Sequence, residues 1–60
     1  MGGTDRFFKV YSNLPLNIRK EVILLIEDKP ITWNVAYNEV YNKTKLGDVI
    51  LQKLIDLGVI

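Results

Sequence analysis

The sequence has no cysteine and no histidine among its 60 residues, and its single serine is Ser12. No disulfide can therefore stabilise the fold, and the usual ligands of a structural zinc site are missing. Nucleophile–base pairs of the Ser–His or Cys–His kind are excluded for the same reason. Clustered carboxylates and a glycine-rich phosphate loop are absent as well. We expect a protein that is not an enzyme and that uses no metal, cofactor or small-molecule substrate.

Charge of one sign and long hydrophobic runs are also scarce. Eight Lys and Arg residues face seven Asp and Glu residues, and the net charge is +1. This balance argues against a non-specific polybasic coat for nucleic acid or anionic lipid. The longest uninterrupted apolar run covers only residues 22–26, whereas a membrane-spanning helix needs about 20 apolar residues. The sequence predicts a cytoplasmic protein with no membrane segment.

The chain is rich in hydrophobic residues, which make up 48% of it. The aromatic residues alone make up 10% of the chain. Such a composition is typical of a folded domain and not of a disordered segment. The length predicts a single domain, residues 1–60. We divide it into an N-terminal arm, residues 1–11, and a body, residues 12–60. The arm is expected to be a brief strand or an irregular segment packed on the body.

Three helices are expected in the body. Pro15 suits a first helical turn and Lys29-Pro30 ends a helix, so the first helix is predicted over residues 15–28. The second, over residues 33–43, follows Thr32 as a cap and has the strongest periodicity, with apolar residues at i, i+3, i+4, i+7 and i+8. The third starts after a cap at Thr44 or Gly47 and runs to about residue 57, with Gly58 as a left-handed C-terminal cap.

This order of elements resembles the winged helix-turn-helix family. The resemblance rests on Pro30-Ile31-Thr32 before the second helix, on Thr44-Lys45-Leu46-Gly47 before the third, and on the closing stretch 54–60, Leu-Ile-Asp-Leu-Gly-Val-Ile. It implies a first short strand at Ile31 and a second strand entered after the third helix. The chain ends where a wing would begin, and Tyr41 and Lys45 depart from the compact motif of bacterial repressors. The fold class expected is all-α, or α with a minimal β element built from Ile31, Val59 and the arm, as a three-helix, winged-helix-like bundle.

The resemblance implies a small DNA-binding protein, a transcriptional regulator or accessory factor that acts as a dimer on double-stranded DNA. Basic and amide side chains near the turn and on the third helix would contact phosphates and bases. These residues are Lys43, Lys45, Gln52 and Lys53, with Asn38 and Asn42 secondary. Asp48 and Asp56 on the same helix would repel phosphate. An ordinary solvated surface is the competing interpretation for each of these residues.

The alternative function is a winged-helix-type module for protein–protein interaction without nucleic-acid binding. The near-zero net charge favours it. Contacts with a second copy or another protein would come from the arm and the C-terminal end, namely from Phe7, Phe8, Val59 and Ile60.

Two further sequence patterns can each be interpreted in two ways. The row Asn34, Asn38, Asn42 is either a binding surface or a matter of composition, and the aromatic stripe Trp33, Tyr37, Tyr41 is either core, which we favour, or a stacking platform for single strands.

Overall fold

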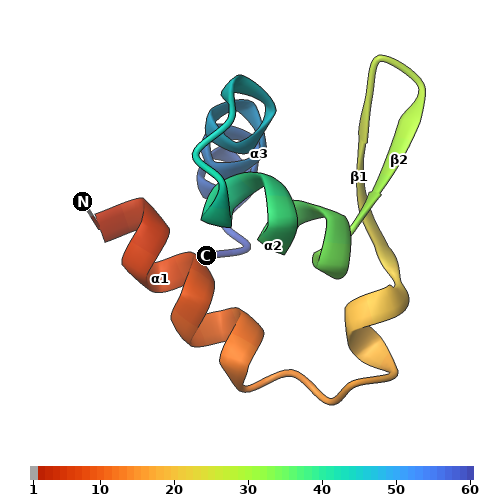
Figure 1. The fold of residues 1–60 in the computed structure, drawn as a ribbon, viewed down its shortest axis with the longest axis vertical. Coiled ribbons are helices and arrows are strands. Elements are labelled where there is room, and N and C mark those ends of the chain that lie inside the picture. The colour runs from red at the N-terminus through yellow and green to blue at the C-terminus, as the bar shows by residue number, and fades with distance from the viewer. Residues whose placement is uncertain (1) are drawn as a thin grey trace.

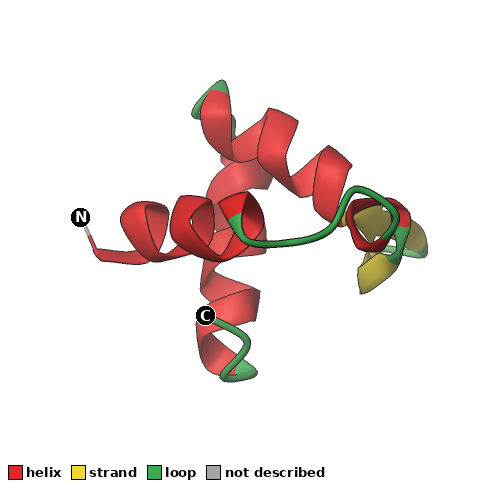
Figure 2. Ribbon diagram, turned by 90° about the horizontal axis from the view of Figure 1, so that it is seen from below, coloured by secondary structure: helices red, strands yellow, loops and turns green. Residues whose placement is uncertain are grey.

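The computed structural model describes residues 2–60, and Met1 lies outside the described part. The fold consists of three α-helices, one short 3-10 helix and one antiparallel hairpin, and the hairpin lies between the first and second α-helices in the sequence (Figure 1). The elements are α1 (Gly2–Ser12), η1 (Ile18–Lys20), β1 (Val22–Ile26), β2 (Lys29–Thr32), α2 (Trp33–Tyr41) and α3 (Lys45–Asp56). A mostly helical fold with a minimal β element is therefore confirmed. Seen from below in Figure 2, the hairpin and η1 lie to one side of the three α-helices.

The second and third predicted helices are confirmed together with their caps. The Thr32 hydroxyl accepts a hydrogen bond from the Val35 amide at 3.1 Å, which starts α2. The Thr44 hydroxyl accepts one from the Gly47 amide at 2.9 Å, which starts α3. Gly58 ends α3 with a φ of 74°, as predicted. These signals were sufficient because each depends on a few adjacent residues.

The helix predicted over residues 15–28 is wrong. Its second half is the strand β1, which pairs antiparallel with β2. Glu27 and Asp28, at φ 50° and 68°, form a two-residue turn between Ile26 and Lys29. Such turns usually contain Asn-Gly or Asp-Gly, so the hairpin carried no conspicuous turn sequence. A run of apolar residues fits a buried helix and a buried strand equally well, and the β-branched residues of β1 favour the strand.

The predicted arm is also different, because residues 2–12 form the helix α1 instead of a strand or an irregular segment. The glycines at its start do not prevent this, since packing stabilises the helix from outside. A Cβ at Gly3 would lie 3.1 Å from Ile55 Cδ1 of α3, which shows how closely the two helices approach. The expected sheet was therefore right only for Ile31. Val59 lies outside any strand, and the arm contributes none.

The core forms where the three helices and the inner face of the hairpin meet. Phe7, Ile50 and Leu54 are its largest fully buried side chains and come from α1 and α3. The other buried apolar residues are Leu24, Ile26, Ile31, Trp33, Ala36 and Val40. All elements except η1 contribute to this cluster, so a chain of this size uses nearly every element to bury its apolar surface.

Candidate functional site

The turn between α2 and α3 comprises three residues and holds the two helices close together. Lys43 adopts the left-handed conformation, φ 57°, and the Thr44 amide bonds back to the Glu39 carbonyl at 3.1 Å. The Lys43 amide also bonds to the Val40 carbonyl at 3.2 Å, which completes a Schellman motif. The Thr44 hydroxyl donates to the Glu39 carboxylate while it caps α3. These hydrogen bonds hold the short connection between α2 and α3.

Gly47 allows the close approach of the two helices. A Cβ at this position would lie 2.5 Å from the Glu39 carbonyl oxygen and 2.8 Å from the Glu39 carbonyl carbon. Both are backbone atoms of α2, which no side-chain movement can displace. The sequence suggested Gly47 only as a possible cap, and its role in helix packing emerges from the tertiary contact.

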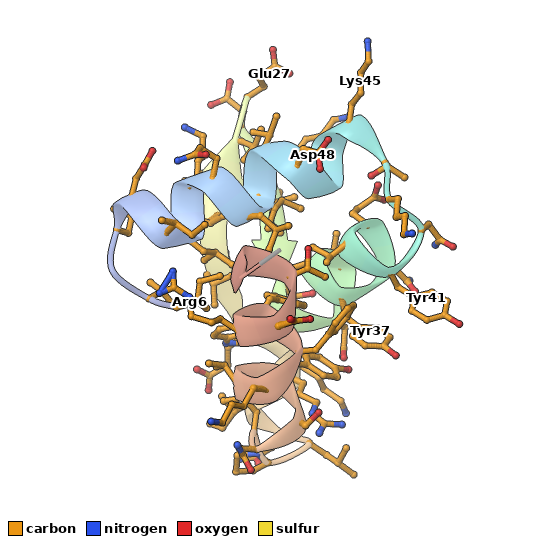
Figure 3. The ribbon with its side chains drawn as sticks, turned by 90° about the vertical axis from the view of Figure 1, so that its left-hand side faces the viewer. Arg6, Glu27, Tyr37, Tyr41, Lys45 and Asp48 are labelled. Carbon is orange, nitrogen blue, oxygen red and sulfur yellow. The ribbon has the colours of Figure 1, made fainter. Side chains whose placement is uncertain are left out.

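The exposed face of α3 has no net charge. Lys45 and Lys53 are exposed on it, and so are Asp48 and Asp56. The Gln52 side-chain amide, predicted to contact bases, donates to Asp56 Oδ1 at 2.9 Å. Lys45 extends outward from the first turn of α3, whereas Asp48 lies on the side facing the viewer in Figure 3. The helix that would enter a DNA groove therefore presents mixed charges and a glutamine that is already hydrogen-bonded.

The asparagine row lies along α2, and two of its three side chains make intramolecular hydrogen bonds. Asn34 Oδ1 accepts from the Tyr11 hydroxyl at 2.7 Å, which ties α2 to α1. The Asn42 side-chain amide donates to the Asn38 carbonyl at 2.9 Å at the end of α2. All three asparagines are exposed, and the side chains of Asn34 and Asn42 also have structural roles.

The four residues predicted for dimer contacts range from fully buried to exposed. Phe7 is completely buried, and Phe8 is half-buried with its ring at 72° to that of Tyr37. Ile60 is half-buried and packs against the core, whereas Val59 is 43% exposed. Phe7 therefore belongs to the core of its own chain, and Val59 is the most accessible of the four.

The sequence interpretation missed the outer surface of the hairpin. Leu25 is 69% exposed and Val22 is 55% exposed, although β1 is apolar throughout. The sheet has two strands, so each of them has one edge without a strand partner among residues 2–60. The five-residue apolar run was the signal for this surface, but it pointed to an edge strand only once the hairpin was known.

The aromatic stripe divides into a buried and an exposed part. Trp33 is buried, as predicted, and its ring centroid lies 5.9 Å from that of Phe7. Tyr37 is half-buried, whereas Tyr41 is 64% exposed, so the assignment of the stripe to the core is wrong for Tyr41. Both tyrosines project from the same side of α2 in Figure 3.

A cleft of about 450 Å³ opens beside Tyr41. Its lining comes from all three helices and from the turn before α3. The residues are Thr4, Phe8, Val40, Tyr41, Lys43, Gly47, Asp48 and Leu51. An aromatic wall with one cation and one carboxylate suits a planar ligand that carries both donors and an anion.

Other kinds of site find no support in the described chain. Nowhere in residues 2–60 do three or more acidic side chains gather where they could hold a metal ion. None of the three α-helices has the length and hydrophobicity needed to cross a membrane.

The comparisons with known proteins found no relative. No protein-family model matches the sequence, and neither a curated protein nor a solved structure matches the chain.

Proposed function

We propose that this protein is an association module that pairs with a polypeptide strand along the outer edge of β1, and that its first partner is a second copy of itself. The observation that carries the proposal is an edge strand built only of apolar residues, two of which have exposed side chains. Leu25 and Val22 are more than half exposed, and the strand contains no charged or polar side chain. Unprotected edges of this kind are templates for strand addition.

The two edges of the hairpin are not equivalent, and only β2 is protected. Ile26 and Lys29 flank the two-residue turn, so Leu25 and Pro30 form the next, non-hydrogen-bonded pair. The backbone groups of such a pair point away from the partner strand. Pro30 therefore removes a donor from the outer edge of β2, whereas Leu25 presents its N–H and C=O on the outer edge of β1.

Charge favours an antiparallel pairing of two β1 strands. Lys20 precedes the strand and Glu27 and Asp28 follow it, whereas the Arg19 guanidinium lies over the Tyr11 ring. An antiparallel pair brings Lys20 of one strand beside the acidic end of the other. Two short strands bury a small area, so the dimer belongs to the weak, concentration-dependent class.

The test is the effect of Leu25→Pro on the mass of the protein in solution. Proline at this position removes the outward N–H and leaves the bonds between β1 and β2 intact. Sedimentation equilibrium at increasing concentration should show two chains for the wild type and one for Leu25→Pro, with unchanged far-ultraviolet circular dichroism. Leu16→Lys is the matched control, because Leu16 is 73% exposed but lies outside the strand. A wild-type protein that remains monomeric at millimolar concentration would contradict the self-pairing.

A second function, duplex DNA binding by a regulator or accessory factor, is favoured by the three-residue, hydrogen-bonded connection between α2 and α3. Lys43 and Lys45 are exposed at this turn, and Lys53 is exposed further along α3. Ile31 in a strand directly before α2 supports a winged-helix relationship, although the hairpin precedes the two helices instead of following them. Phosphate contacts from these lysines would supply most of the affinity.

Anisotropy of a labelled duplex at several salt concentrations tests this second function. Lys45→Glu should weaken binding to every sequence, and Gln52→Ala should relax sequence preference. Lys29→Glu is the control, because Lys29 lies at the exposed tip of the hairpin. Equal affinities for Lys45→Glu, Lys29→Glu and the wild type would remove the helix-turn-helix as the DNA-binding element.

A further inference from the structure

The exposed ring of Tyr41 is the last member of an ordered stack. The Arg19 guanidinium lies 4.3 Å from the centroid of the Tyr11 ring. Tyr11 stacks on Tyr37 with centroids 4.5 Å apart, and Tyr37 stacks on Tyr41 with centroids 5.8 Å apart. The interplanar angles are 20° and 17°, so the three rings are nearly parallel. The stack holds the orientation of Tyr41 and leaves its outer side accessible.

The stack is anchored at several points below Tyr41. The Tyr11 hydroxyl donates to Asn34, and the Phe8 and Tyr37 rings form a T-shaped pair with centroids 5.6 Å apart. A tyrosine that is 64% exposed gains little from burial in its own chain. An ordered, exposed aromatic face beside a cleft is therefore a surface prepared for a planar ligand.

We propose that this cleft binds an unpaired nucleotide of a single-stranded nucleic acid, with its base stacked on Tyr41. Every base has a π-face that can stack on an aromatic side chain. Lys43 lines the cleft and can bind the adjoining phosphate, and Asp48 lines it and can accept a hydrogen bond from an exocyclic amine. Tyr41 and Asp48 thus match the face and the edge of the base, and Lys43 matches the phosphate.

Charge favours a single strand over a free nucleotide, and access to the base face favours it over a duplex. The cleft contains one cation and one carboxylate, which suits a phosphodiester with one negative charge better than a free nucleotide with several. In a duplex the base faces are covered by neighbouring bases, so Tyr41 cannot stack on them. The cleft shares no residue with the edge of β1, but it shares Asp48 with the exposed face of α3 and Lys43 with the proposed duplex site. The comparison of single strand with duplex, together with Tyr41→Ala, distinguishes the two nucleic-acid functions.

The experiment measures the binding of a fluorescent single-stranded DNA of mixed sequence, about 12 nucleotides long. Anisotropy at about 50 mM salt should show tighter binding of this strand than of the same strand annealed to its complement. Tyr41→Ala should weaken binding by about tenfold, since one stacked base is lost. Tyr41→Phe should bind like the wild type, because no hydrogen bond of the Tyr41 hydroxyl contributes. Lys43→Gln should weaken binding, and Lys53→Gln, on the far part of α3, should not.

Two further measurements test the fold of each variant and the position of the bound base. Far-ultraviolet circular dichroism of each variant shows whether it is folded, and the ring protons of Tyr41 should shift upfield when the strand is added. Equal affinity of Tyr41→Ala and the wild type would overturn the proposal. So would equal affinity for duplex and single strand, or equal affinity for cytidine monophosphate and the oligonucleotide.

Discussion

Replacing Gly47 by alanine tests the contact that joins α2 to α3. In the interior of a helix, alanine normally stabilises relative to glycine by about 1 kcal/mol. Here the new Cβ would lie 2.5 Å from the Glu39 carbonyl oxygen, whereas carbon–oxygen contacts are usually about 3.3 Å or longer. The helices would have to separate by roughly 0.8 Å, the difference between these distances, and the core contacts of Ile50 and Leu54 would loosen.

The cost of this separation outweighs the gain in helix propensity. Overpacking a close contact costs about 1–3 kcal/mol, and the upper end applies where the opposing atoms are backbone. Subtracting the propensity gain leaves a loss of about 2 kcal/mol in the free energy of unfolding. For a chain of this size that is a drop in melting temperature of roughly 8–16 °C. A domain of this length has only about 3–9 kcal/mol of stability, so the loss is a large share.

The assay is urea and thermal unfolding followed by circular dichroism, with Gly3→Ala as the matched control. The Cβ at Gly3 meets only the tip of the flexible Ile55 side chain, at 3.1 Å. Gly3→Ala should therefore be neutral or should stabilise by up to about 1 kcal/mol. If Gly47→Ala proved as stable as the wild type, or if both variants behaved alike, the close approach of α2 and α3 would be refuted.

Three smaller changes test the turns and caps by the same unfolding assay. The double variant Glu27→Asn, Asp28→Gly should stabilise by about 1 kcal/mol, because both positions have positive φ; a lower urea midpoint would count against this turn geometry. Lys43→Gly should stabilise by about 0.5–1 kcal/mol at the left-handed end of α2, and a loss of stability would show that the position is not left-handed. Thr44→Ala should destabilise by about 1–2 kcal/mol, because the cap of α3 and the bond to Glu39 are both lost; Thr44→Ser should recover most of it, and equal stability of Thr44→Ala and wild type would exclude the cap.

The residues of the β1 edge and Tyr41 both stood out in the sequence, but their exposure to solvent did not. The apolar run of β1 was visible as composition, but its exposure follows from a hairpin whose turn is Glu-Asp. Tyr41 was visible as part of an aromatic stripe, but at the end of α2 it is 64% exposed, although Val40 beside it is buried. The exposure of both candidate surfaces thus depends on how the elements pack together, which helical periodicity does not report.

The sequence by itself determined α2, α3 and the signals at their ends. Thr32, Thr44 and Gly58 act through hydrogen bonds and dihedral angles within a few residues, so local chemistry suffices to place them. The absence of cysteine and histidine likewise excluded whole classes of chemistry before any fold was known.

Tertiary structure alone decided the state of the first half of the chain. Residues 22–26 became a strand because Lys29–Thr32 lies beside them, and α1 formed across two glycines because Phe7 is buried between the other elements. The hairpin pairs residues no more than ten positions apart, whereas Phe7 packs against residues far along the chain, such as Trp33. In both cases burial and pairing outweigh local propensities, which differ by only about 1 kcal/mol per residue.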